Sequence, residues 1–91
     1  MNTTTQPTWD YTDDYYHTVI NNTEINIRGY DKNKLHLYIY DHDQDIEIID
    51  DELSSIQETL TTINKNLKLQ LHINDLPTLD QLLQLQQQQG A

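Results

Sequence analysis

The sequence predicts an α+β domain, with an antiparallel sheet of about five strands and two helices on one face, in the order ββββαβα. Two observations support this prediction. Short stretches in which apolar and polar residues alternate recur along the chain, as in strands that bury one face. Two later stretches repeat apolar residues every three or four positions, as in amphipathic helices.

The first half of the chain is expected to supply four strands. Asn21 and Asn22 predict the turn of a first hairpin, because asparagine favours turn conformations. Leu35, Leu37 and Ile39 alternate with polar residues, which is the clearest strand pattern in the chain. The four strands are expected at residues 15–20, 24–28, 34–40 and 45–49, and the fourth should pair back on the third.

The second half is expected to form a helix, a strand and a helix. Apolar residues spaced by three, four and three predict a helix over residues 52–63. Alternating leucines over residues 67–73 predict a fifth strand with one buried face. Thr78 and Gln81 match a capping box, which predicts a final helix over residues 78–86.

Three parts of the chain are expected: an irregular N-terminal arm over residues 1–14, a single α+β domain over residues 15–86, and a disordered Gln-rich tail over residues 87–91. A chain of 91 residues suits one small domain with a modest core. The predicted core residues are Leu37, Ile39, Ile48, Leu60, Leu69 and Leu71. The opposite face of the sheet is expected to carry His36, Tyr38, Tyr40, Asp45, Glu47, Lys68 and His72.

The chain is strongly acidic. Fifteen acids against five bases give a net charge of −10, and twelve of the acids lie in residues 1–52. This charge repels nucleic acid and anionic lipid and attracts a positively charged partner, so we expect no direct binding to nucleic acid or membrane. No apolar stretch approaches the ~20 residues of a membrane span, and we expect a cytoplasmic protein. The absence of cysteine excludes thiolate metal sites and disulfides.

Residues 41–52 contain seven acids and no base. Four of the acids fall at positions one, three, five and twelve of the calcium loop of the EF-hand family, which the run therefore resembles: Asp41, Asp43, Asp45 and Glu52. The resemblance implies a calcium site. The chain departs from the family at the sixth position, where Ile46 replaces glycine, and residues 34–40 alternate like a strand where the family has a helix. We therefore keep a calcium-binding module only as a third alternative and predict no metal ligands.

Other catalytic or cofactor chemistry lacks a motif. The four histidines include no i, i+4 pair that would hold zinc, and two isolated glycines make no phosphate-binding loop. Carboxylates are abundant, but no apolar pocket sequence marks one of them for a raised pKa. We expect no cofactor, no catalytic residue and no enzymatic activity.

Acids and tyrosines together predict a surface for an Arg- and Lys-rich protein, because they offer ion pairs, hydrogen bonds and cation–π contacts. Alternate residues of a strand lie ~6.6–6.8 Å apart, a step comparable to that between successive phosphates, so carboxylates on a strand can imitate a nucleic acid. The predicted partner-binding residues are Asp13, Asp14, Tyr40, Asp41, Asp43, Asp45, Glu47, Asp50, Asp51 and Glu52.

In its small size, lack of cysteine, strong acidity and α+β pattern, the chain resembles the small inhibitors carried by phages and mobile elements, namely the anti-CRISPR and anti-restriction proteins. The resemblance implies a non-catalytic inhibitor that occupies a basic, nucleic-acid-binding surface of a host defence complex. We expect a monomer or a homodimer. The alternative is an immunity protein or antitoxin that neutralises a basic nuclease through the same surface.

Overall fold

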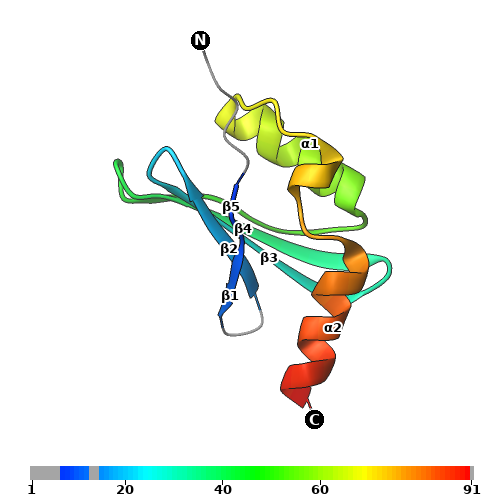
Figure 1. Cartoon of the computed structure of the whole chain (residues 1–91). Helices are drawn as coiled ribbons and strands as arrows, with labels where there is room; N and C mark the ends of the chain where they lie inside the picture. Colours follow the sequence, from blue (N-terminus) through cyan, green and yellow to red (C-terminus); the bar gives the residue numbers. More distant parts are fainter. Residues whose placement is uncertain (1–6, 13–14, 91) are drawn as a thin grey trace.

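The computed structural model describes residues 7–12 and 15–90 and consists of a five-stranded antiparallel sheet with two α-helices on one side of it (Figure 1). The elements are, in chain order, β1 (Asp10–Thr12), β2 (Tyr15–Ile20), β3 (Thr23–Asp31), β4 (Lys34–Asp41), β5 (Ile46–Leu53), α1 (Ile56–Leu67), the 3₁₀ turn η1 (Ile73–Asp75) and α2 (Leu79–Gly90). The predicted α+β class, five-stranded antiparallel sheet and pair of helices are confirmed.

The strands lie side by side in their chain order, β1-β2-β3-β4-β5, so each pairs with the next. Asn21 and Asn22 join β2 to β3 with φ angles of 51° and 62°, which lie in the left-handed region. Asparagine tolerates this region better than most residues, which explains why the predicted hairpin closes with a two-residue turn. Strands β1 and β5 form the two edges of the sheet.

Side-chain alternation in β3 and β4 divides the sheet into a core face and an open face. Ile25 and Ile27 of β3 lie opposite Ile39 and Leu37 of β4, and all four are fully buried. Residues from both helices and from the segment between them complete the core. Its buried apolar residues are Ile25, Ile27, Leu35, Leu37, Ile39, Leu60, Ile63, Leu71, Leu76 and Leu82.

Helix α2 comes very close to the sheet at Gly29 of β3. A Cβ atom at this position would lie 2.8 Å from the Cβ atom of Leu82, which is closer than carbon atoms pack. Leu82 itself is buried in the core. The missing side chain at Gly29 therefore allows α2 to pack directly against β3.

The prediction of a strand over residues 67–73 is wrong. Helix α1 ends at Leu67, and Lys68 takes the left-handed conformation of a helix C-cap, with φ 56° and ψ 44°. The Asn64 side chain then accepts from the backbone N–H of Leu71 and donates to its C=O, both at 3.0 Å. These bonds satisfy the Leu71 backbone without a neighbouring strand. The alternation reflects an irregular segment that buries Leu71 and exposes the residues on either side of it.

The fifth strand comes instead from the N-terminal side. Asp10–Thr12, which the sequence places in the irregular arm, form β1 and pair with β2. The indole N–H of Trp9 donates to the backbone C=O of Asp75 at 2.7 Å, and the Trp9 ring packs against the core. Trp9 and β1 therefore belong to the domain.

The acidic run also folds differently from the prediction. Strand β5 continues to Leu53, whereas the sequence predicts a helix from residue 52, and α1 begins only at Ile56. The helix start is fixed by its cap. Oγ of Ser55 accepts from the N–H of Glu58 at 3.1 Å, and the Glu58 carboxylate accepts from the N–H of Ser54 at 2.8 Å. The last acids of the run therefore lie on a strand.

Helix α2 starts near the predicted residue and ends later. The N–H of Thr78 donates to Oε1 of Gln81 at 2.8 Å, and the N–H of Gln81 donates to Oγ1 of Thr78 at 3.1 Å, so the predicted capping box is present. The backbone is helical through Gly90, so residues 87–90, expected to be disordered, continue α2, while residue 91 lies outside the described residues. Neither described helix has the length and apolar character needed to cross a membrane.

The predicted core is mostly correct. Four of its residues are buried, namely Leu37, Ile39, Leu60 and Leu71. Ile48 and Leu69 are only half-buried at the margin of the core. Ile48 is an extra residue in β5, and Leu69 follows the C-cap of α1, so neither occupies the regular strand position that the prediction assumes.

We expect Gly29→Ala to destabilise the domain by about 1–3 kcal/mol, because the added methyl group overlaps Leu82 and displaces α2. Urea unfolding followed by circular dichroism measures this loss. Val19→Ala, at a 52% exposed position, serves as the control and should change stability by less than ~0.5 kcal/mol. Equal losses in the two variants would contradict the close packing at Gly29.

Ile63→Ala should cost about 2–5 kcal/mol, because Ile63 is fully buried and its truncation leaves a cavity. Leu69→Ala should cost clearly less, because a half-buried side chain leaves space that water can enter. The same unfolding experiment compares the two. If Leu69→Ala costs as much as Ile63→Ala, then Leu69 belongs to the core as the sequence predicts.

Candidate partner-binding surface

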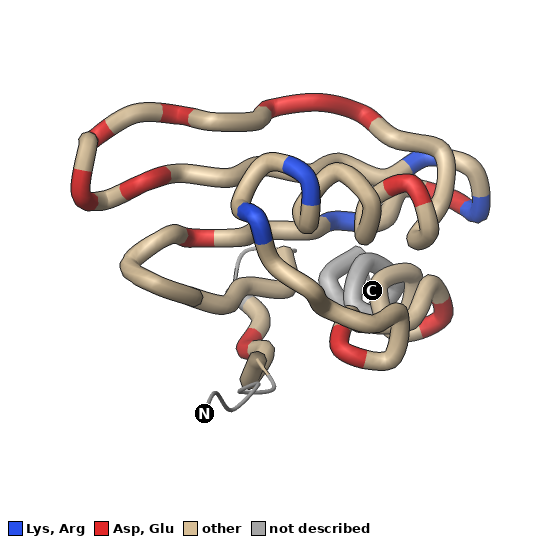
Figure 2. The backbone as a smooth tube through the Cα atoms, turned by 90° about the horizontal axis from the view of Figure 1, so that it is seen from above, with Lys and Arg blue, Asp and Glu red and all other residues tan. Residues whose placement is uncertain are grey.

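The acidic run forms the end of β4, the following turn and the edge strand β5. Figure 2 shows its acids in red along this hairpin. Asp41 ends β4 and is half-buried, while Asp43 and Asp45 are exposed in the turn. The remaining four acids are exposed on β5, namely Glu47, Asp50, Asp51 and Glu52.

The structure brings eight of the ten predicted partner-binding residues together on one hairpin. Tyr40 is half-buried on the open face of β4, beside the acids. Asp13 and Asp14 lie outside the described residues. Asp50, Asp51 and Glu52 belong to the surface as predicted, but they lie on a strand rather than at the start of a helix.

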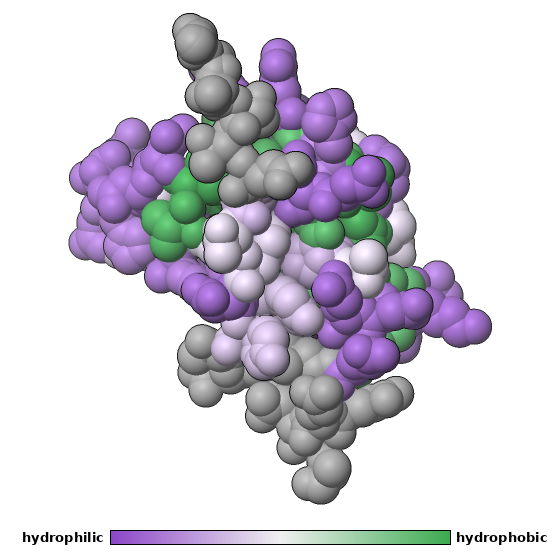
Figure 3. Space-filling view, viewed as in Figure 1, coloured by the Kyte–Doolittle hydropathy of each residue, from purple (hydrophilic) through white to green (hydrophobic). Residues whose placement is uncertain are grey.

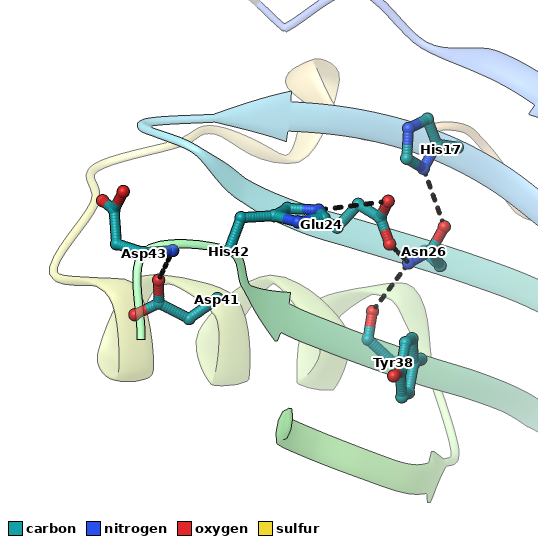
Figure 4. Close-up of polar contacts among 7 residues, drawn as sticks. All are labelled: His17, Glu24, Asn26, Tyr38, Asp41, His42 and Asp43. Carbon is teal, nitrogen blue, oxygen red and sulfur yellow. Dashed lines mark hydrogen bonds and ion pairs between the residues drawn. The ribbon is translucent and has the colours of Figure 1, made fainter. Parts of the chain in front are cut away.

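Two acids of the turn also hold its backbone in place. Oδ1 of Asp41 accepts from the N–H of Asp43 at 2.9 Å, as Figure 4 shows, and from the N–H of Gln44 at 3.3 Å. Asn22 donates to Oδ1 of Asp43 at 2.6 Å, which links this turn to the one between β2 and β3. Asp45 takes a left-handed φ of 58°. In Figure 3, hydrophilic side chains gather over the left side of the view, where Figure 1 places these two turns.

The strand explains why the EF-hand resemblance does not extend to the structure. A calcium loop must curl so that its first and last ligands meet around one ion. Here Asp41 lies opposite Ile46, while Glu52 lies opposite His36 towards the other end of β4. Across residues 7–12 and 15–90, no group of three or more histidine and carboxylate side chains is arranged to hold a metal ion.

A β-bulge aligns three of the acids on the open face of β5. The facing pairs of β4 and β5 are Tyr40 with Glu47, Tyr38 with Asp50, and His36 with Glu52. Ile48 is an extra residue at the register shift between the first two pairs. Without it, Glu47 and Asp50 would point to opposite faces, because side chains alternate along a strand. The bulge therefore places Glu47, Asp50 and Glu52 at successive alternate positions of one face.

The open face is hollowed beside these acids, with a volume of about 530 Å³. We name this concavity the sheet hollow. Asn26 of β3 and Tyr38 of β4 lie side by side in register at its centre. The lining residues are Tyr15, His17, Glu24, Asn26, His36, Tyr38 and Asp50.

Asn26 organises one side of the sheet hollow, as Figure 4 shows. Its Nδ2 donates to the C=O of Tyr38 at 3.3 Å, and its Oδ1 lies 2.8 Å from Nδ1 of His17. With Asn26 in this orientation, neutral His17 donates from Nδ1 and keeps Nε2 as an acceptor. Oε2 of Glu24 lies 3.3 Å from Nε2 of His42. The polar side chains on this side of the hollow are therefore held by one another and, at Glu24, by His42 outside the hollow.

On the other side, Tyr15, His36 and Asp50 form a chain of contacts. Oη of Tyr15 lies 2.6 Å from Nδ1 of His36, and Nε2 of His36 lies 2.5 Å from Oδ1 of Asp50. Because a carboxylate only accepts, His36 donates to Asp50 from Nε2. Burial, followed by the effect of neighbouring Tyr30, raises the pKa of Tyr15, which favours the neutral hydroxyl. We interpret the chain as a means of positioning Asp50 rather than of activating Tyr15 as a nucleophile.

Several carboxylates lie close enough to Tyr38 for their negative charges to act on it. Burial raises the pKa of Tyr38, and the charges of Glu47, Glu24 and Asp50 raise it further. Negative charge that disfavours a phenolate favours a cation at the same place. The sheet hollow therefore combines an aromatic ring with a negative electrostatic potential.

Two cations already lie against aromatic rings of this face. Nζ of Lys34 is 5.5 Å from the centre of the Tyr30 ring. The guanidinium of Arg28 is 4.9 Å from the centre of the Tyr30 ring and 5.9 Å from the centre of the Tyr15 ring. All three distances fall within the range of cation–π attraction. The open face therefore presents its rings in a way that suits cations.

The register confirms part of the predicted open face, namely His36, Tyr38, Tyr40 and Glu47. Three other residues predicted there lie elsewhere. Lys68 caps α1 and His72 precedes η1, because residues 67–73 do not form a strand, while Asp45 lies in the turn.

The sequence does not identify His17, Glu24 and Asn26 as site residues. Glu24 and Asn26 alternate with two buried isoleucines, so their position on the open face is readable from the pattern. Their meeting with His17 and Tyr38 depends on the register of three strands, which no single segment encodes.

The ionisation of tyrosine should reveal the environments of Tyr15 and Tyr38 on the open face and of Tyr16 on the core face. Burial raises the pKa of Tyr15, Tyr16 and Tyr38 above the ordinary 10.0 in the folded protein. The neutral forms therefore stabilise the fold fully below the unfolded pKa, and this contribution is lost as the pH rises through the folded values. We expect phenolate absorbance to appear at higher pH in the folded protein than in urea. This difference in pH should be smaller in Tyr38→Phe, which lacks one of the three tyrosines. Coincident titration curves in the two states would contradict this.

A comparison of the chain with protein-family models, with curated proteins and with solved structures finds no match.

Proposed function

We propose that the protein is a non-catalytic acidic inhibitor whose β4–β5 hairpin occupies a basic, nucleic-acid-binding surface of a host defence complex, as many anti-CRISPR proteins do. The observation that supports this best is the line of Glu47, Asp50 and Glu52 on the open face of β5. Asp50 and Glu52 are two strand positions apart, or ~6.6–6.8 Å, and Glu47 follows at the next open-face position beyond the bulge. This step is comparable to that between successive phosphates of a nucleic-acid strand.

The position of the line in the fold supports the same role. Strand β5 is an edge of the sheet, so a groove on a partner can receive it without opening the domain. The exposed acids Asp43 and Asp45 extend the negative surface beyond the end of the strand. The hairpin therefore offers a narrow, charged ridge rather than a flat patch. We define the ridge by its exposed acids Asp43, Asp45, Glu47, Asp50 and Glu52.

The charge of Glu52 is only weakly paired within the protein, whereas Asp50 is held by His36. Nζ of Lys34 lies 3.7 Å from the Glu52 carboxylate, and the two side chains are 52% and 61% exposed. Exposed ion pairs of this kind contribute only about 0–1 kcal/mol, so a basic partner can readily displace the lysine. The net charge of −10 also speeds association with a basic partner.

The first test is an affinity series on a partner captured from host lysate. We expect the triple variant Glu47→Gln, Asp50→Asn, Glu52→Gln to bind this partner about 10- to 100-fold more weakly, because three ion pairs of modest strength are lost. Calorimetry or surface plasmon resonance measures the dissociation constants. Wild-type affinity should fall as salt rises, since exposed charges are screened within about 8 Å at physiological ionic strength.

The matched control removes the same number of charges elsewhere, at the exposed Asp10, Asp31 and Asp80, each changed to asparagine. This control should retain affinity within a few-fold. Equal weakening in both triple variants would show that only net charge matters and would refute the proposed ridge. Nucleic acid bound by the partner should also compete with the protein, whereas a stable ternary complex would rule out mimicry.

The identity of the captured partner separates the two functions expected from the sequence. A nucleic-acid-guided defence complex supports the inhibitor. A basic nuclease whose activity the protein blocks supports the immunity protein or antitoxin, which would use the same ridge.

A further inference from the structure

We propose that the sheet hollow is a binding site for an arginine side chain of the basic partner, with the guanidinium over the ring of Tyr38 and between Glu24 and Asp50. The inference rests on the proposed function for its partner protein, and it concerns the hollow beside the ridge, which shares Asp50 with it. It assigns to the open face a specific contact in addition to the general attraction of the acids.

The dimensions of the sheet hollow suit such a ligand. Its volume of about 530 Å³ falls within the ~300–1,000 Å³ typical of sites that hold small ligands or side chains. It opens on the sheet face next to the edge strand that bears the ridge. A partner that grips β5 can therefore place a long side chain in the hollow.

The aromatic content favours arginine over lysine. The planar guanidinium can stack on the face of a ring, and it is more weakly hydrated than an ammonium group. Tyr38 and Tyr15 both line the hollow, and the Tyr15 ring already lies 5.9 Å from the guanidinium of Arg28. Arg28 already adopts this arrangement against Tyr30, at 4.9 Å from the ring centre.

The polar groups at the rim match the donors of a guanidinium. Glu24 and Asp50 supply acceptors on β3 and β5, on either side of Tyr38 of β4. His17 adds Nε2 as an acceptor, because its Nδ1 contacts Oδ1 of Asn26 at 2.8 Å. A guanidinium stacked on a ring points its five N–H donors outwards in one plane, so it needs acceptors on several sides of the ring.

The charge of the sheet hollow excludes the opposite class of ligand. Glu24 and Asp50 line the hollow, and beside the larger effect of burial the charges of Glu47, Glu24 and Asp50 raise the pKa of Tyr38. The same field repels phosphates and carboxylates. The hollow therefore suits a cation.

The test uses two short probes, N-acetyl-Gly-Arg-Gly-amide and its lysine counterpart, titrated into the isotope-labelled full chain. We expect the arginine probe to shift the NMR signals of the Asn26 side-chain amide and of Tyr38 in a saturable way. Its dissociation constant should be at least about threefold lower than that of the lysine probe, because only a guanidinium can both stack on a ring and form bidentate hydrogen bonds. Equal affinities for the two probes would overturn the proposal.

Three variants locate the binding. Glu24→Gln and Tyr38→Leu should each weaken the arginine probe at least about threefold, while Tyr38→Phe keeps the ring and should retain most of the affinity. Asp31→Asn removes the same charge at an exposed position outside the hollow and should have no effect. Circular dichroism checks that each variant is folded. If Tyr38→Leu binds as tightly as wild type, or if Asp31→Asn weakens binding as much as Glu24→Gln, the hollow is not the site.

The two proposals fail in different ways. Suppose that the arginine probe does not shift the NMR signals of Asn26 and Tyr38, but the triple variant Glu47→Gln, Asp50→Asn, Glu52→Gln (the ridge variant) no longer binds the captured partner. The arginine site is then wrong and the proposed function stands. If the probe saturates the hollow but the ridge variant binds the partner as tightly as wild type, the proposed function is wrong and the arginine site stands.

Discussion

The alternation of side chains in β3 and β4 is the constraint on which both the core and the candidate binding surface depend. Ile25 and Ile27 point to the helices, so Glu24 and Asn26 between them must point to the open face. A shift of one residue would bury the polar residues and expose the isoleucines, and the cost of this exchange fixes the register. The packing that buries the core therefore also determines which side chains line the sheet hollow.

Periodicity in the sequence predicts which side of a segment is apolar, but not what that segment pairs with. Strand β4 and residues 67–73 show the same alternation, yet only β4 lies between turns that bring neighbouring strands beside it. After α1, the Asn64 side chain satisfies the backbone that a strand partner would otherwise bind. Strand β1 has three residues, too few to show a period, and Trp9 beside it is held by Asp75, 66 residues away.

The location of the acidic run was predictable, but its geometry was not. Acids suit both the start of a helix and an exposed edge strand, so charge alone does not distinguish them. The cap formed by Ser55 and Glu58 determines that these acids lie on the strand, because it begins α1 after the run has ended. The alignment of Glu47 with Asp50 then depends on the bulge at Ile48, and a bulge leaves no clear mark in a single sequence.

An edge strand normally risks pairing with another copy of the same chain. The acids of β5 oppose this, because two such edges repel each other, and they leave a basic chain as the favoured neighbour. Asp50 belongs both to the ridge and to the rim of the sheet hollow, where His36 holds it. An arginine in the hollow would neutralise Asp50 and change the field along the ridge. Because they share this carboxylate, the proposed contributions of ridge and hollow to partner binding should not be additive.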